Sequence, residues 1–375
     1  SHCLWLKTPS GRQFSKIVGV DDTGKTVTVE DTFTIASDSA VDYAIGGKRA
    51  TWDNTDSRKI FADAKAGWVI ETETDQTLTS VVDVGASGTN SGYITVRGNT
   101  DNPRPVVTQS ASGDYGFDLA SATYGEQICW EFAALHFKHS GATRQYMFRA
   151  QEWISGPVFI WRNCICGDVP KGNNPSGLIT YGNQRVPVVL IDCTIRYCSS
   201  VAINCGASTP QLYHCHIHHC GGAVRWYGWD GDFLLIDGCL FHDCSGHAIQ
   251  NSSETGGKPV IIRNSIFANN GGTGIKGNSS GGERYWHISQ NIFAGNGGYG
   301  IDLLESQINS GLSELDWNAY YNNTSGNISN GSIGPNSIQL TADPFVDAAN
   351  GDFNINDAPG GGALLRAAHF TIGAE

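Results

Sequence analysis

The sequence predicts an all-β parallel solenoid, in which each turn of the chain stacks on the turn before it. A short apolar strand with a Cys or Asn at fixed positions recurs throughout residues 189–301. The equivalent positions are Cys193, Cys215, Cys239, Ser265 and Asn291, so that successive copies are 22, 24, 26 and 26 residues apart. The chain also has 47 Gly, one Met and only 16% charged residues, a composition typical of turn-rich β structure. Repeats of this length without helical periodicity indicate a solenoid whose turns bury a shared core.

The order of motifs along the chain predicts three segments. We expect residues 1–91 to form an N-terminal cap with the first irregular turns, including a strand over 25–35 where apolar and polar residues alternate. Residues 92–341 are predicted to form the solenoid. Its turns include 93–99, 128–141, 158–168 and a last one over 315–327. Residues 342–375 contain a Gly360-Gly361-Gly362 run and an apolar stretch after it, which we interpret as a C-terminal capping segment.

The cysteines follow the repeat. The chain has 11 Cys, and six of them form three copies of C-x4-C, in which the second Cys is later replaced by Asn270 and Asn296. Three interpretations stay open: buried free thiols, disulfides between stacked turns, and a metal site. The exchange of Cys for Asn favours packing over metal binding, and free thiols would favour assembly in a reducing compartment.

The net charge limits the class of partner. The formal charge is −12, and no cluster of Lys and Arg is present, so we exclude a nucleic-acid backbone as the partner. No stretch of about 18 consecutive apolar residues is present, so we expect no membrane insertion. No cofactor motif is found either, and we expect no cofactor.

The densest set of titratable side chains is a group of histidines. Placing Cys215 in the core turns His216 and His218 outward, because alternate residues of a strand face opposite sides. His242 follows Cys239 at the same offset as His218 follows Cys215, so the two rings should lie on adjacent turns about 4.8 Å apart. His216, His218 and His242 are therefore candidate metal ligands. The competing and favoured interpretation is a polar outer face whose rings stack on one another or meet another subunit.

A second cluster of candidates follows Val224. Exposed aromatic rings stack on sugars, and two carboxyls about 6.5–9.5 Å apart can hydrolyse a glycosidic bond with inversion. The glycan-binding candidates are Arg225, Trp226, Tyr227 and Trp229, and the catalytic candidates are Asp230, Asp232, Asp237 and His242. The alternative is that the aromatic residues pack against the side of the solenoid or against another chain.

The repeat also resembles a known class. The units at 264–275 and 291–301, with DPFVDAANGDF at 343–353, are similar to right-handed parallel β-helix proteins of the pectate-lyase-like class, over roughly residues 92–353. The resemblance implies a single-stranded right-handed parallel β-helix. The class includes polysaccharide lyases and hydrolases, and also bacteriophage tailspikes and fibres. DYAIGGKRATW at 42–52 and the C-terminal GGGALLRAA look more like the virion proteins of this class.

The enzymatic signatures of the class are not matched. Polygalacturonase-like enzymes carry N-T-D, D-D, G-H-G and R-I-K motifs in successive turns. Here the fragments at 99–101, 246–248 and 274–276 are incomplete or misplaced, and the D-D pair at 21–22 lies outside the repeat. Pectate lyases need a carboxylate cluster for Ca²⁺ beside a basic residue, and no such column accompanies Arg196, Arg225 or Lys276. No catalytic role is therefore transferred to this chain.

The resulting functional hypothesis is a non-enzymatic structural and adhesive β-helix. The resemblance implies a bacteriophage virion component such as a tail spike, fibre or capsid-surface decoration, assembled in the host cytoplasm. Its partners would be other virion proteins or copies of itself in a homotrimer, and it would contact a cell-surface polysaccharide. Two alternatives are a polysaccharide lyase or glycoside hydrolase, and a bacterial surface or secreted glycan-binding protein.

Overall fold

The computed structural model divides the chain into two units, residues 1–52 and 53–375, and each is described by itself. It describes residues 2–8, 11–21, 26–29, 42–47, 69–72, 75–78, 82–83, 94–98, 104–109, 115–118, 129–139, 146–150, 158–167, 177–181, 187–206, 209–227, 233–252, 259–277, 285–308, 313–368 and 370. In this described part of the chain, no helix is both long enough and apolar enough to cross a membrane.

The first unit contains a four-stranded antiparallel sheet in the order β3-β2-β1-β4. Its strands are β1 (His2–Thr8), β2 (Gly11–Asp21), β3 (Thr26–Val29) and β4 (Asp42–Gly47). The strand predicted over 25–35 is therefore present in its first part, as β3. Strand β4 ends with the glycine pair Gly46-Gly47.

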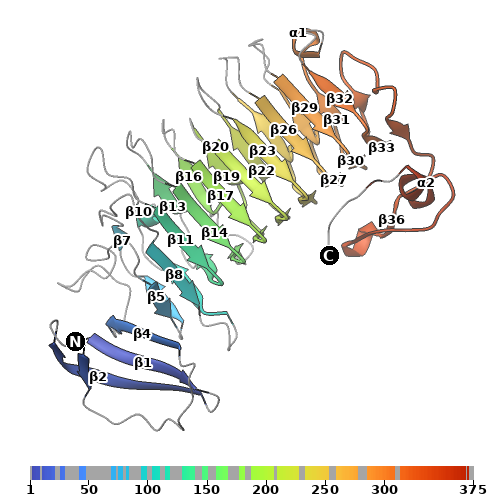
Figure 1. Ribbon diagram of the computed structural model, residues 1–375. Helices are drawn as coiled ribbons and strands as arrows, with labels where there is room; N and C mark the ends of the chain where they lie inside the picture. The colour runs from blue at the N-terminus through green and yellow to red at the C-terminus, as the bar shows by residue number, and fades with distance from the viewer. Residues whose placement is uncertain are drawn as a thin grey trace. The chain divides into compact units, whose positions relative to one another are not determined.

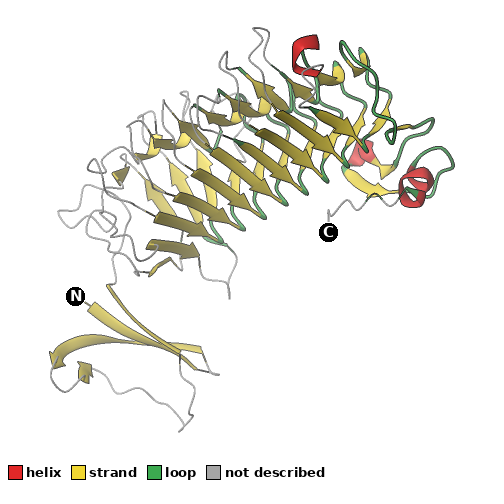
Figure 2. Ribbon diagram, turned by 45° about the horizontal axis from the view of Figure 1, so that its top comes forward, coloured by secondary structure: helices red, strands yellow, loops and turns green. Residues whose placement is uncertain are grey.

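The second unit contains three parallel sheets that run side by side (Figures 1 and 2). Sheet I contains β5 (Val69–Thr72), β8 (Ile94–Gly98), β11 (Cys129–Ala133), β14 (Val158–Arg162), β17 (Pro187–Ile191), β20 (Thr209–Tyr213), β23 (Leu234–Asp237), β26 (Pro259–Arg263), β29 (Tyr285–Ser289) and β32 (Glu314–Asp316). Sheet II contains β6 (Gln76–Leu78), β9 (Val106–Gln109), β12 (His136–His139), β15 (Ile165–Gly167), β18 (Thr194–Arg196), β21 (His216–His218), β24 (Leu240–His242), β27 (Ile266–Ala268), β30 (Ile292–Ala294), β33 (Ala319–Tyr321) and β35 (Ile338–Gln339). Sheet III contains β7 (Val82–Asp83), β10 (Tyr115–Asp118), β13 (Tyr146–Ala150), β16 (Ile179–Tyr181), β19 (Val201–Cys205), β22 (Gly222–Trp226), β25 (Ile249–Asn251), β28 (Ile275–Lys276), β31 (Tyr299–Asp302) and β34 (Gly326–Ile328).

This arrangement is the predicted parallel solenoid. Each strand pairs in parallel with its equivalent in the next turn, as β21 does with β24 and β24 with β27. The first sheet strands, β5 to β7, precede residue 92, so the stack begins earlier in the chain than the segment to which we assigned the regular turns. A short helix, α1 (Glu305–Ile308), follows β31 near one end of the stack (Figure 1).

Aromatic rings form a continuous column inside the solenoid. Phe241, Phe267, Phe293 and Tyr320 occupy the same inward position of sheet II in four successive turns. Successive ring centroids are 5.0, 5.0 and 5.4 Å apart, and all four residues are fully buried. Burial of large aromatic rings is a main source of stability, so this column is a major part of the core.

Side chains at the corners of the turns form hydrogen-bonded ladders. The backbone N–H of Cys215 donates to Cys239 Sγ at 3.3 Å, Cys239 N–H donates to Ser265 Oγ at 3.0 Å, and Ser265 N–H donates to Asn291 Oδ1 at 3.0 Å. These contacts confirm the predicted equivalence of Cys, Ser and Asn. Each side chain accepts a bond from a buried backbone N–H that the β-ladder leaves unpaired, which is why a small polar or thiol group is needed there.

All the cysteines whose side chains the structure describes are buried free thiols. They are Cys164, Cys166, Cys193, Cys198, Cys205, Cys215, Cys220, Cys239 and Cys244. The interpretation as packing residues therefore holds for these nine positions.

The C-terminal segment lies against the side of the β-helix. It contains β36 (Phe345–Asp347), a 3₁₀ turn (Ala348–Asn350), β37 (Asp352–Ile355) and α2 (Gly362–Ala367), seen beside β27 and β30 in Figure 1. Its apolar side chains form one buried cluster with outward-facing residues of sheet II. The members include Phe345, Phe353 and Leu365 from the segment and Ile266, Ala268, Ile292, Ala294 and Ala319 from the sheet. The segment expected to cap the solenoid thus covers the outer face of sheet II.

Candidate functional site

The outer face of sheet II changes character along the stack. In β27, β30 and β33 the outward residues are apolar and the C-terminal segment covers them. In β18, β21 and β24 the outward residues are mainly polar, and they are Thr194, Arg196, His216, His218, Leu240 and His242. With the adjoining corner residues His219 and Asp243, the histidines form what we call the histidine cluster: His216, His218, His219, His242 and Asp243.

The backbone positions the cluster through short strands and tight corners. Strand β21 has three residues, of which Ile217 points into the core, so that His216 and His218 both point outward. His219 and Asp243 occupy the corner after the strand in successive turns, with φ of 53° and 51°. His and Asp adopt this left-handed conformation more readily than most residues, so the local sequence suits the corner.

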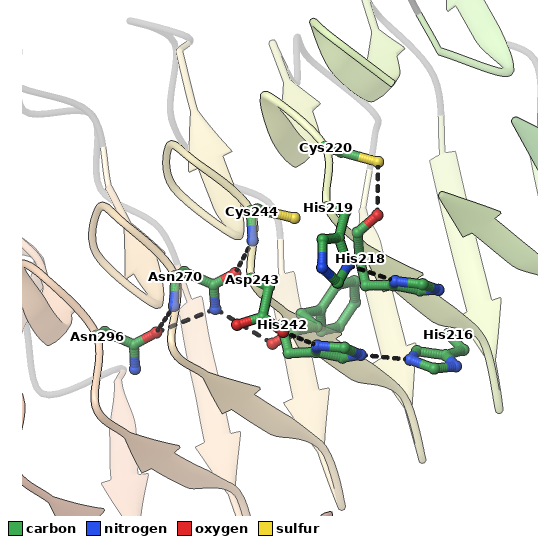
Figure 3. A network of polar contacts seen from close by, with 10 residues as sticks. His216, His218, His219, Cys220, His242, Asp243, Cys244, Asn270 and Asn296 are labelled. Atoms are coloured by element: carbon green, nitrogen blue, oxygen red, sulfur yellow. Dashed lines mark hydrogen bonds and ion pairs between the residues drawn. The ribbon is translucent and has the colours of Figure 1, made fainter. Parts of the chain in front are cut away.

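The ring nitrogens of the cluster lie close to one another (Figure 3). His216 Nε2 is 2.6 Å from His242 Nε2, and His242 Nδ1 is 2.7 Å from Asp243 Oδ2. His218 Nδ1 is 2.8 Å from His219 Nδ1. The His218 and His242 rings stack in parallel, with centroids 4.9 Å apart and an angle of 5° between their planes. The His216–His242 contact and the His218–His242 stack therefore connect adjacent turns, whereas the His218–His219 and His242–Asp243 contacts lie within one turn.

The predicted contact between His218 and His242 is confirmed, because the two residues pair in register between β21 and β24. His242 lies on the outer face of sheet II, but its side chain is covered. His242 is only 3% exposed, since the ring of Phe353 from the C-terminal segment lies over it at a centroid distance of 4.4 Å. His216 and His218 are half-buried, and His219 is exposed.

The environment of the cluster lowers the pKa of three of its imidazoles, those of His216, His218 and His242. Burial, followed by the neighbouring His242, lowers the pKa of His216 to about 4. Burial, followed by His216, lowers the pKa of His218 to about 3. Burial also lowers the pKa of His242, although the contact with Asp243 acts in the opposite direction. At neutral pH these rings therefore carry no charge, and each has one nitrogen lone pair available.

Two overlapping groups in the described part of the chain have the donor spacing of a metal site. The first is His216, His218 and His242, and the second is His219, His242 and Asp243; within each, the donor atoms lie within 4.8 Å of one another. His242 belongs to both, which makes it the centre of the cluster.

Tyr197 extends the site, and sequence reasoning missed it. Its side chain is 47% exposed, and its ring lies 5.1 Å from the His219 ring and 5.7 Å from the His218 ring. It occupies the same corner as His219, one turn earlier, with φ of 56°. Tyr197 follows Cys193 at the same offset as His219 follows Cys215, and this equivalence in the sequence could have identified it.

The glycan-binding candidates around β22 are only partly on the surface. Trp226 is fully buried because alternation along β22 directs it into the core, so it cannot stack on a sugar. Arg225 is half-buried, with its guanidinium 5.1 Å from the ring centre of Tyr227 and its Nε donating to Ser252 Oγ at 3.1 Å. Trp229 lies outside the described residues.

The catalytic candidates give no acid–base pair whose geometry can be measured. Asp230 and Asp232 lie outside the described residues. Asp237 accepts hydrogen bonds from Arg263 Nη2 and from Asn264 Nδ2, both at 2.8 Å. These contacts connect β23 with the next turn, so both partners of the Asp237 carboxylate lie in that turn.

Comparison with known proteins supports the fold. A family model described as "Right handed beta helix region" matches residues 170–314, in agreement with the predicted handedness. No curated protein matches the chain. A similar solved structure is the A-module of mannuronan C-5 epimerase AlgE6 from Azotobacter vinelandii, at 11% identity and a TM-score of 0.27, with 70% of this chain and 91% of that chain covered.

Proposed function

We propose that this protein is a structural and adhesive β-helix that binds a glycan on the polar part of the outer face of sheet II. One observation carries the proposal: the C-terminal segment covers the apolar part of this face and reaches His242 of β24, while the part formed by β18 and β21 keeps outward polar side chains. A contiguous polar and aromatic surface beside a rigid scaffold is suited to ligand binding.

The side chains at the edge of this face fit a sugar ligand. Tyr197 offers an exposed ring face beside two imidazoles, and aromatic faces pack on the apolar side of a pyranose ring. Asp192 and His214 lie at the opposite corner of the same turns, with their side chains 61% and 64% exposed. Both are available to bond sugar hydroxyls, so the face combines a stacking platform with polar groups.

The carboxylates of this face favour binding over hydrolysis. Asp243 Oδ2 is 2.7 Å from His242 Nδ1, and Asp192 Oδ1 is 3.6 Å from His214 Nδ1. Glycosidases use one carboxyl as an acid and another as a base or nucleophile. Each carboxylate here already faces a histidine, an arrangement that supports a positioning role for both.

Some parts of the functional hypothesis stay predictions from sequence. They are the assembly into a bacteriophage virion, the homotrimer, the assembly in the host cytoplasm and the alternative of a secreted or cell-surface protein. The glycan-binding proposal does not depend on which of them holds.

The proposal is tested with an array of acidic and neutral polysaccharides, probed with the full chain. We expect the wild type to bind at least one polysaccharide and Tyr197→Ala to lose at least tenfold in affinity. Tyr285→Ala is the matched control, because Tyr285 is 38% exposed on sheet I, outside this face. Equal losses in both variants would contradict the proposed location. Release of reducing ends or unsaturated uronates that disappears on Asp243→Asn would replace the adhesive function with an enzymatic one.

A further inference from the structure

We infer that the histidine cluster binds a divalent transition-metal ion of the Zn²⁺ type, with His216 and His242 as ligands from adjacent turns and His218 as a third. The inference goes beyond glycan binding and does not rest on it. Imidazole nitrogens prefer Zn²⁺, Cu²⁺ and Ni²⁺, whereas Ca²⁺ and Mg²⁺ prefer oxygen ligands. The donor set therefore selects the class of ion.

The distance between the two nearest donor nitrogens is close to the distance between two nitrogens that bind the same Zn²⁺ ion. His216 Nε2 and His242 Nε2 are 2.6 Å apart. A Zn–N bond of about 2.0–2.1 Å and a tetrahedral angle place two ligand nitrogens ~3.3 Å apart, so the pair must open by ~0.7 Å. His242 is held beneath Phe353, whereas His216 is half-buried. The His216 ring is therefore the one that would move to increase the distance between the two nitrogens.

Asp243 orients the central ligand. With Asp243 Oδ2 at 2.7 Å, His242 Nδ1 carries the proton that it donates to the carboxylate, which leaves the lone pair on Nε2. That lone pair faces His216 (Figure 3). Metal-binding histidines are commonly oriented by a carboxylate on the other ring nitrogen, which raises the basicity of the ligand. Asp243 would thus orient His242, the ligand, without binding the ion itself.

His218 completes the site by rotating. Its ring stacks on that of His242, and a nitrogen of each ring lies within 4.8 Å of the other donors. Two parallel stacked rings cannot both direct lone pairs at one ion, so the half-buried His218 must turn about its side-chain torsions.

The proposed site connects two turns of the solenoid. His216 and His218 come from β21 and His242 from β24, so one ion links neighbouring turns. An ion that binds only the folded chain stabilises it by mass action, and the melting temperature should rise with ion concentration. The coordination positions of the ion that no histidine occupies would be filled by water or by an atom of a bound ligand.

The test is isothermal titration of ZnCl₂ into the full chain after treatment with a chelator, without glycan. We expect one ion per chain, with affinity reduced at least tenfold in His216→Ala and in His218→Ala. Neither residue is fully buried, and the circular dichroism spectrum of each variant is compared with that of the wild type to check that it folds. His287→Ala is the control, since His287 lies on β29 with its side chain 48% exposed. His219→Ala should bind normally.

Three results of the zinc titration would overturn the inference. They are no binding by the wild type, unchanged binding in both His216→Ala and His218→Ala, and loss of binding in His219→Ala alone, which would place the ion in the other group. Co²⁺ binding distinguishes the donors directly. We expect a visible spectrum without a thiolate-to-cobalt band, and the presence of that band would assign the ion to cysteine and also overturn the inference.

Discussion

The ring of Phe353 lies over the ring of His242, with the two centroids 4.4 Å apart. This contact marks the boundary between the covered and the open part of sheet II. Phe353 is 5% exposed and belongs to the cluster that joins the C-terminal segment to the sheet. The contact therefore connects the stability of the segment to the environment of the histidine cluster.

Replacing Phe353 by Ala should loosen the C-terminal segment. Removing a buried Phe side chain costs about 3–5 kcal/mol. We expect a lower denaturant midpoint and faster proteolytic cleavage within residues 343–368 than in the wild type. Val346→Ala is the control, because Val346 is 57% exposed and its replacement should change stability by no more than about 0.5 kcal/mol. Equal proteolysis of the two variants would show that Phe353 does not anchor the segment.

The asparagine ladder should tolerate Cys better than Ala. Asn296 Oδ1 accepts from Asn270 Nδ2 at 3.0 Å, and Asn296 Nδ2 donates to the Phe267 carbonyl at 2.9 Å. Asn296→Ala leaves buried partners unpaired, at about 1–3 kcal/mol for each group. Asn296→Cys should lose less, because Cys244 fills the equivalent position two turns earlier, bonded through Asn270. The free energies of unfolding of the two variants test this prediction. An Asn296→Ala variant that is more stable than Asn296→Cys would contradict it.

Trp226 should behave as a core residue. Its side chain is fully buried, so Trp226→Ala should destabilise the protein by about 3–5 kcal/mol, as measured by thermal or chemical unfolding. Tyr227→Ala, at a half-buried position, should cost less. If Trp226→Ala instead kept full stability and lost only glycan binding, the side chain would have to lie on the surface.

The metal-free protein should lose stability as the pH falls. In the unfolded chain a histidine titrates near 6.5, whereas in the folded protein the pKa of His216 is lowered to about 4 and that of His218 to about 3. Between these values the unfolded state binds more protons, so the free energy of unfolding decreases from pH 6.5 towards pH 4. Urea midpoints measured with a chelator present test this. The double variant His216→Gln/His218→Gln should show a flatter dependence, and an unchanged dependence would exclude these two rings as its source.

The buried thiols should be unreactive until the chain unfolds. Burial raises the pKa of Cys215 and of Cys164, and the thiolate is the reactive form. We expect peptide mass spectrometry to find these two residues unmodified after alkylation of the folded protein and fully modified after alkylation in denaturant. Rapid native labelling of Cys215 would contradict its position in the core.

Features that depend on the repeat could be predicted from the sequence, and features that depend on distant segments could not. The constant offset from Cys215 and Cys239 placed His218 beside His242, because register in a solenoid follows directly from the repeat. Burial of His242 depends on Phe353, which approaches only after the C-terminal segment has folded back. Ile266 and Ile292 are apolar residues at outward positions of the repeat, and such a pattern in the sequence indicates that another segment covers them.

The position of Trp226 could have been read from the sequence. Alternation in β22 places Val224 and Trp226 on the inner side and Arg225 on the outer side. Of the two interpretations of the aromatic residues, packing against the solenoid therefore holds for Trp226. The catalytic roles of Asp230 and Asp232 stay predictions.

The most direct test of the account is a crystal structure of the protein soaked with Zn²⁺, with data collected on both sides of the zinc absorption edge. The account predicts one strong anomalous difference peak on the outer face of sheet II, between His216 Nε2 and His242 Nε2, with Asp243 still bonded to His242 Nδ1. A structure with no peak at these two nitrogens, or with the peak at cysteine sulfur, would contradict the claim that the histidine cluster binds a metal ion.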